Sequence, residues 1–76
     1  MTDIDLAQIV TLISRVGEIE SLSPSEDFYE AGLSSINALT LLMELEDTFG
    51  VSIPDEQFVH ARTADALQHL LMSLQA

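Results

Sequence analysis

The sequence predicts an all-α fold, a single domain over residues 1–76 with three longer helices, one short third helix and a long loop between the first two. Three observations support this prediction. Apolar residues recur at helical spacing in several segments, and Ser, Thr, Pro and Gly stand where helices begin and end. No segment shows the alternation of a β-strand. The 76 residues allow one small domain and no second.

Acidic side chains dominate the charge of the chain. It holds 13 acidic and two basic residues, a formal net charge of −11. This charge disfavours nucleic acid and anionic membranes as partners, and acids at Asp3 and Asp5 do not fit a signal peptide. We therefore expect a cytoplasmic monomer whose partners carry basic patches. Its 47% of apolar residues argues against disorder, and its lack of cysteine excludes thiol chemistry of its own.

The first helix is predicted from Asp3 to Val16, with Gly17 just past its end. Its apolar stripe comprises Leu6, Ile9, Val10, Ile13 and Val16. Residues 18–34 are predicted to form a long ordered loop that has room for one helical turn. The apolar residues expected to anchor this loop in the core are Leu22, Phe28, Tyr29 and Leu33. Loops of this length in compact domains are often functional.

The second helix is predicted over Ser35–Phe49, with serines at its start for capping and Gly50 as its C-cap. Steps of 100° place one apolar stripe toward the core: Ala38, Leu41, Leu42, Leu45 and Phe49. The opposite side carries an apolar line flanked by carboxylates: Ile36, Met43 and Asp47, with Leu39 at its edge and Glu46 close by. This helix therefore has an outer face suited to contact with a partner.

The remaining chain predicts a short helix and a final longer one. Val51–Pro54 reads as an extended connector, with Pro54 at the start of a helix that reaches about Ala61. Thr63 is expected to cap the last helix. The apolar stripe of that helix is Ala66, Leu67, Leu70, Leu71 and Leu74.

Motifs for catalysis or metal binding are missing from the sequence. The segment 32–36, Gly-Leu-Ser-Ser-Ile, lacks the closing glycine and preceding strand of a nucleophile elbow. His60 and His69 are too far apart in the sequence for a helical metal pair. Residues 3–5 lack the glycine and distal glutamate of a calcium loop. We therefore expect neither a metal site nor catalysis by the chain alone.

The serine pair has two interpretations. A serine at a helix start is most often a cap and nothing more. Here, however, Ser35 follows a long loop and the flexible Gly32, and a helix N-terminus favours a phosphate group. An exposed apolar line edged with acid runs beside it. The sequence thus allows a phosphate ester at this position, with a basic enzyme docked on the neighbouring face.

The run Glu-Ala-Gly-Leu-Ser-Ser-Ile at 30–36 resembles the phosphopantetheine attachment motif of acyl carrier proteins and peptidyl carrier domains. The resemblance continues through 41–49 and through Ile-Pro-Asp-Glu at 53–56, and it covers nearly the whole chain. Registering on Phe49, fourteen residues after the modified serine of the family, selects Ser35 and leaves Ser34 where aspartate is usual. Ser34 would then keep a capping role without the charge.

This resemblance implies a four-helix acyl-carrier-protein-like bundle without catalytic activity. A phosphopantetheinyl transferase would move 4'-phosphopantetheine from coenzyme A to Ser35, and the terminal thiol would hold acyl or aminoacyl cargo as a thioester. The borrowed thiol fits the absence of cysteine. Implied partners are that transferase, an acyl or aminoacyl ligase, and downstream synthases or transferases of lipid or secondary-metabolite biosynthesis with basic docking patches.

Residues expected to contact these partners surround Ser35 and continue along the second helix: Ser34, Ile36, Leu39, Met43, Glu46 and Asp47. Ser34, Asn37 and Thr40 are neutral where carriers of bacterial fatty acid synthesis are typically acidic. This difference argues against the standard partners of fatty acid synthesis. The run Ala-Gly-Leu-Ser-Ser at 31–35 resembles specialised stand-alone carriers and secondary-metabolite carriers, and fatty acyl, polyketide and amino acid cargo stay open. The alternative function is an unmodified acidic helical adaptor that binds a basic protein through the outer face of the second helix.

Overall fold

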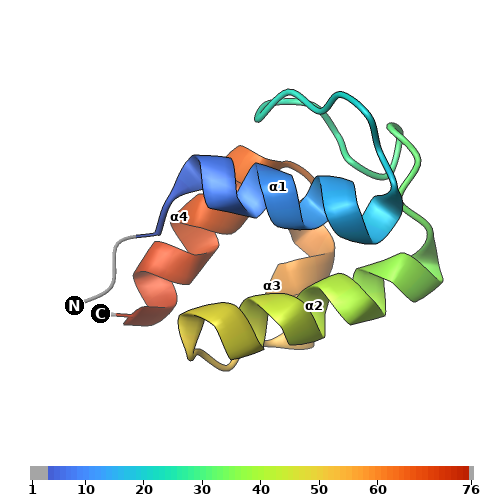
Figure 1. Cartoon of the computed structure of the whole chain (residues 1–76). Helices are drawn as coiled ribbons and strands as arrows, with labels where there is room; N and C mark the ends of the chain where they lie inside the picture. The colour runs from blue at the N-terminus through green and yellow to red at the C-terminus, as the bar shows by residue number, and fades with distance from the viewer. Residues whose placement is uncertain (1–3, 76) are drawn as a thin grey trace.

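A computed structural model describes residues 4–75 as four helices joined by loops (Figure 1). α1 spans Leu6–Gly17, α2 spans Ser35–Phe49, α3 spans Asp55–His60 and α4 spans Ala64–Gln75. No strand occurs within this described range. α1 packs against both α2 and α4. The predicted all-α fold, with its short third helix and the long loop between the first two, is confirmed.

All four helices and the loops between them contribute to one apolar core. Its largest fully buried side chains are Phe28, Ile9, Ile13, Leu41, Leu45, Leu67 and Leu71. The connectors add Leu33 and Ile53, and α3 adds Phe58. Among residues 4–75 the core contains no buried polar or charged residue. Burial of apolar side chains, at roughly 1.5–3 kcal/mol each, is therefore what holds this small bundle together.

The bounds of α1 differ from the prediction at both ends. Asp5 is the N-cap, and its Oδ1 accepts a hydrogen bond from the Ala7 N–H at 2.9 Å, so the helix begins at Leu6. The predicted start, Asp3, lies outside the described residues. The predicted end at Val16 was wrong, because Gly17 is helical and Glu18 adopts the left-handed conformation with φ 53°.

Gly17 is the last residue of α1 rather than the residue just past its end, and it allows close packing. A Cβ atom at this position would lie 2.8 Å from Cδ1 of Leu33, which is buried. The absence of a side chain therefore lets the segment before α2 pack closely against the end of α1.

The α1–α2 loop, residues 18–34, contains turns and no continuous helix. One isolated helical turn is present, as the sequence allowed, because the Ala31 N–H donates to the Asp27 carbonyl at 3.0 Å. Phe28 and Leu33 are buried, and Leu22 and Tyr29 are half-buried, which confirms all four predicted anchors. The Phe28 N–H donates to the Arg62 carbonyl at 3.0 Å. The loop is thereby fixed to the connector between α3 and α4.

α2 matches its predicted bounds and caps. Gly50 closes it with φ 66°, in the left-handed region that favours glycine. Four of the five predicted core residues are buried, and Leu42 is half-buried. The exposed line on the opposite side is also as predicted.

α3 and α4 differ from prediction in detail. Pro54 is the N-cap of α3 rather than a helical residue, and Ala61 follows the helix. The Thr63 hydroxyl accepts a hydrogen bond from the Ala66 N–H at 3.1 Å, which confirms the predicted cap of α4. The buried side of α4 is Ala64, Leu67 and Leu71, while Ala66, Leu70 and Leu74 are half-buried. No helix in residues 4–75 is long and apolar enough to cross a membrane.

Candidate functional site

The two serines at the start of α2 have different environments. Ser34 is the N-cap: its Oγ accepts a hydrogen bond from the Asn37 N–H at 3.1 Å, and the Asn37 Oδ1 accepts one from the Ser34 N–H at 3.3 Å. The Ser34 hydroxyl also donates to Asn37 Oδ1 at 2.8 Å. This reciprocal capping box confirms the predicted role of Ser34. Its hydroxyl is engaged in fixing the helix start.

Ser35 is the first residue of α2 and is exposed. Within residues 4–75 its hydroxyl makes no hydrogen bond. Gly32, with φ 129°, turns the chain just before the helix, and Leu33 is buried beneath it. The chain therefore presents an uncommitted hydroxyl from a firmly held segment.

The first backbone N–H groups of α2 lie beside this hydroxyl. The N–H groups of the first turn have no partner within the helix itself, and Ser34 Oγ accepts only that of Asn37. Such N–H groups and the positive end of the helix dipole stabilise an adjacent phosphate. The position suits a phosphate ester on Ser35.

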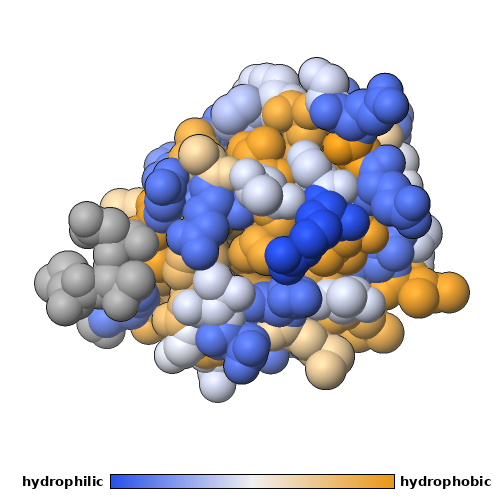
Figure 2. Space-filling model, in the orientation of Figure 1, coloured by the Kyte–Doolittle hydropathy of each residue, from blue (hydrophilic) through white to orange (hydrophobic). Residues whose placement is uncertain are grey.

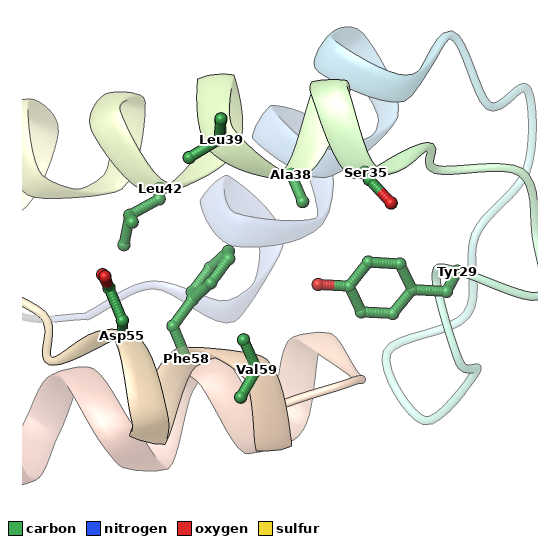
Figure 3. A pocket seen from close by; sticks show the side chains of 8 residues that line it. All are labelled: Tyr29, Ser35, Ala38, Leu39, Leu42, Asp55, Phe58 and Val59. Atoms are coloured by element: carbon green, nitrogen blue, oxygen red, sulfur yellow. The ribbon is translucent and has the colours of Figure 1, made fainter.

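A hollow of about 310 Å³ opens next to Ser35, between α2 and α3 (Figure 3). Its lining is mainly apolar, and the sequence alone did not indicate that α3 would form its second wall. The lining residues are Tyr29, Ser35, Ala38, Leu39, Leu42, Asp55, Phe58 and Val59. A group attached to Ser35 therefore has an apolar groove within reach.

The outer face of α2 carries large exposed apolar side chains. Ile36, Leu39 and Met43 are 79%, 65% and 68% exposed. Val59 of α3, 54% exposed, extends this surface across the hollow, and sequence reasoning missed it. In Figure 2, apolar atoms protrude at the right edge of the molecule, where Figure 1 places the start of α2. An apolar surface thus surrounds Ser35.

The two carboxylates expected at the partner surface are not equivalent. Asp47 is exposed. Glu46 is half-buried, and its Oε2 accepts a hydrogen bond from the Ile53 N–H at 2.8 Å, which fixes the connector between α2 and α3. A third carboxylate, Glu44, pairs with Arg15 of α1 at 3.5 Å. Asp47 is therefore the carboxylate of α2 best placed to meet a partner.

Sequence reasoning missed a cluster of Asp27, Tyr29 and Arg62, of which Tyr29 lines the hollow. Arg62 Nε donates to Asp27 Oδ2 at 2.6 Å, and the Arg62 guanidinium carbon lies 4.7 Å from the centroid of the Tyr29 ring. The hydrogen bond from Arg62 lowers the pKa of Asp27 and the same contact raises the pKa of Arg62. Burial raises the pKa of Tyr29, so it stays a neutral phenol. No local sequence signal pairs Asp27 with the distant Arg62.

The family model described as the phosphopantetheine attachment site matches residues 5–71. The chain belongs to the acyl carrier protein family. The cofactor of this family is covalently attached 4'-phosphopantetheine, and the carrier domain itself is non-catalytic. The residues at the start of α2 fit this group, because an exposed hydroxyl, a helix N-terminus and a hollow of about 310 Å³ meet there.

Three relatives are similar to this chain over different extents. A probable acyl carrier protein of Caulobacter vibrioides is 30% identical over 76 residues, which cover 97% of this chain and 88% of that protein. A mitochondrial acyl carrier protein of Dictyostelium discoideum is 29% identical over 52 residues, 66% of this chain and 43% of that protein. A conidial pigment polyketide synthase of Aspergillus fumigatus is 38% identical over 56 residues, which cover 74% of this chain but 2% of the synthase.

Proposed function

We propose that residues 1–76 form a single carrier domain that holds an acyl or aminoacyl group as a thioester on a 4'-phosphopantetheine arm attached to Ser35. The observation that carries the proposal is the exposed Ser35 hydroxyl, which is free of capping bonds within the described residues and lies at the N-terminus of α2. The arm supplies the thiol that the chain lacks. The carrier presents its cargo to enzymes of lipid or secondary-metabolite biosynthesis.

Attachment requires a phosphopantetheinyl transferase with magnesium in its own site. Ser35 Oγ would attack the phosphorus that bears the pantetheine arm of coenzyme A and lose its proton to the transferase. A new P–O bond forms, the pyrophosphate bond breaks, and adenosine bisphosphate leaves. The chain holds the serine in place, because Leu33 just before α2 is buried in the core. The N–H groups at the start of α2 stabilise the charge of the phosphodiester.

Docking of partner enzymes is assigned to the outer face of α2. Ile36, Leu39 and Met43 supply apolar contact, and the flexible Met43 side chain adapts to several partners. The exposed Asp47 attracts basic patches and raises the association rate, while Ser34 and Glu46 border this surface and fix its backbone. A weak contact suffices, because the tether raises the local concentration of cargo. Cytoplasmic location and a monomeric state stay predictions.

Incubation of the purified chain with coenzyme A and a broad-specificity transferase tests the attachment. Intact mass should increase by one phosphopantetheinyl group. The Ser35→Ala variant should gain nothing, whereas Ser34→Ala, its matched neighbour, should still be modified. An unmodified wild type, or modification that persists in Ser35→Ala, would overturn the proposal.

The second candidate is an unmodified acidic adaptor, favoured by the exposure of Ile36, Leu39 and Met43 before any arm is attached. The variants Ser35→Ala and Met43→Glu separate the two functions when biological function and binding of a basic partner in a pull-down are both measured. If Ser35→Ala leaves both intact while Met43→Glu abolishes them, the chain is an adaptor. Loss of function in Ser35→Ala with normal folding supports the carrier.

A further inference from the structure

The hollow beside Ser35 has a polar group at each side. Its volume of about 310 Å³ leaves room for a short acyl chain. Ala38, Leu42 and Phe58 form much of the apolar lining. Figure 3 shows the Tyr29 hydroxyl directed into the hollow from the α1–α2 loop, with Asp55 of α3 across from it. A short chain fits, and it meets a donor and a carboxylate.

The Tyr29 ring is held in this position from several sides. The backbone N–H of Tyr29 donates to Asp27 Oδ1 at 2.9 Å, which fixes the backbone that bears the ring. Its ring centroid lies 4.8 Å from that of the fully buried Phe28, and the Arg62 guanidinium packs on the ring. Arg62 is in turn fixed by its 2.6 Å contact with Asp27. Rotation of the phenol out of the hollow would therefore break the contacts of its ring with Phe28 and Arg62.

The Tyr29 hydroxyl itself makes no hydrogen bond to any residue in the described range 4–75. A saturated alkyl chain in the hollow would displace water from this hydroxyl and offer no acceptor in return, which is unfavourable. An acyl group that carries an oxygen near its thioester would accept the bond. The raised pKa of Tyr29 keeps the phenol protonated as a donor at neutral pH.

We propose that Tyr29 is a specificity-determining residue that makes the hollow favour short oxygenated acyl groups, such as β-hydroxy or β-oxo acyl chains, over saturated alkyl chains. The inference rests on the proposed function, because the cargo reaches the hollow only when an arm anchored at Ser35 folds back. Asp55, on the opposite side of the hollow, can accept a hydrogen bond from a cargo hydroxyl that reaches that side. Arg62 is a positioning residue that acts through Tyr29.

A pair of cargoes that differ by one hydroxyl tests this inference. The transferase loads the chain directly from butyryl-coenzyme A or from β-hydroxybutyryl-coenzyme A, and intact mass follows cleavage of each thioester by excess hydroxylamine. Dividing the cleavage rate of the same acyl group on free pantetheine by its rate on the carrier gives the protection of that thioester. We expect the hydroxylated cargo to be protected about five-fold more than butyryl, the effect of one hydrogen bond of about 1 kcal/mol. Equal protection of the two cargoes would overturn the inference.

Tyr29→Phe is the decisive variant, because it keeps the ring and removes only the hydroxyl. It should load normally and lose the preference for the hydroxylated cargo. A preference that persists in Tyr29→Phe would overturn the role of Tyr29. Failure of the wild type to load would overturn the proposed function itself, whereas loading with no preference overturns only this inference.

The two arginines provide a matched control for the positioning role. Arg62→Gln should reduce the preference toward that of Tyr29→Phe while butyryl protection stays constant. Arg15→Gln removes the ion pair of Arg15 with Glu44, neither of which lines the hollow, and should leave the preference unchanged. Equal loss in both variants, or no loss in Arg62→Gln, would contradict the assignment of Arg62.

Discussion

The backbone of α2 is hydrogen-bonded within the helix and capped at both ends, whereas the neighbouring α1–α2 loop combines local turns with hydrogen bonds to residues far away in the sequence. Ser34 and Gly50 close the helix. The loop instead donates from Phe28 to the Arg62 carbonyl, and Pro24 accepts from the Asp65 N–H at 3.0 Å. Phe28 is as fully buried as Leu45 of α2. A segment without secondary structure is thus as much a part of the core as a helix.

Truncation of the loop anchor should have the largest effect on stability. Phe28→Ala should lower the free energy of unfolding by about 3–5 kcal/mol and Leu45→Ala by about 2–5 kcal/mol. A core of this size supplies about 3–5 kcal/mol in total, so both variants should be largely unfolded. Urea titration followed by circular dichroism measures the loss. A Phe28→Ala variant that keeps wild-type stability while Leu45→Ala unfolds would mean that the loop is separate from the core.

Substitutions at the boundary between the loop and α2 should lower the free energy of unfolding less than Phe28→Ala does. Ser34→Ala removes the N-cap and should lower the free energy of unfolding by about 1 kcal/mol. Ser35→Ala removes a hydroxyl without bonds to the described residues and should change it by a few tenths of a kcal/mol or less. Urea midpoints at a common slope compare the two variants. Equal losses would show that Ser35 also has a capping role.

The loop should also confer sensitivity to acid. Asp27 has a pKa below its ordinary value because Arg62 donates to it, so its folded pKa lies below its unfolded one of about 3.9. Its contribution to stability is present above the unfolded pKa and is lost as pH falls through the folded pKa. At neutral pH, Asp27→Asn should already be less stable than the wild type, because it lacks this contribution. Below about pH 4 the wild type should lose the same contribution, so the difference in stability between the two proteins should shrink.

Thermal melts between neutral pH and acid measure this difference. Asp47→Asn, which removes an exposed carboxylate of α2, serves as the matched control and should retain the wild-type pH profile. If Asp27→Asn and the wild type show the same dependence on pH, the contact with Arg62 does not stabilise the loop.

A substitution on the outer face of α2 should change stability little and act on docking instead. Met43→Gln should alter the free energy of unfolding by no more than about 0.5 kcal/mol, because the side chain is 68% exposed. It should nevertheless lower kcat/KM for phosphopantetheinylation about five-fold, since it removes an apolar contact worth about 1 kcal/mol. Thr48→Ala, an exposed change further along α2, is the control. If Met43→Gln kept the kcat/KM of the wild type, Met43 would not belong to the docking surface.

Whether the limits of an element could be predicted depends on whether neighbouring residues or distant contacts set them. The bounds of α2 were predicted because capping serines, an apolar stripe and a glycine are all local signals. The end of α1 was misplaced because Gly17 is used for contact with Leu33, and a glycine after an apolar stripe does not distinguish packing from a left-handed cap. Glu46 was assigned to partners, but its bond to the Ile53 N–H depends on where the next connector runs.

The sequence by itself determined the all-α class, the capped second helix, the exposed apolar line from Ile36 to Met43 and the motif that singles out Ser35. These features depend on residues close together along the chain. The tertiary structure alone decided that α3 forms the second wall of a hollow and that Arg62 holds Tyr29 beside it. Such contacts join residues that are distant in sequence, and they arise only when burial of the common core brings their segments together.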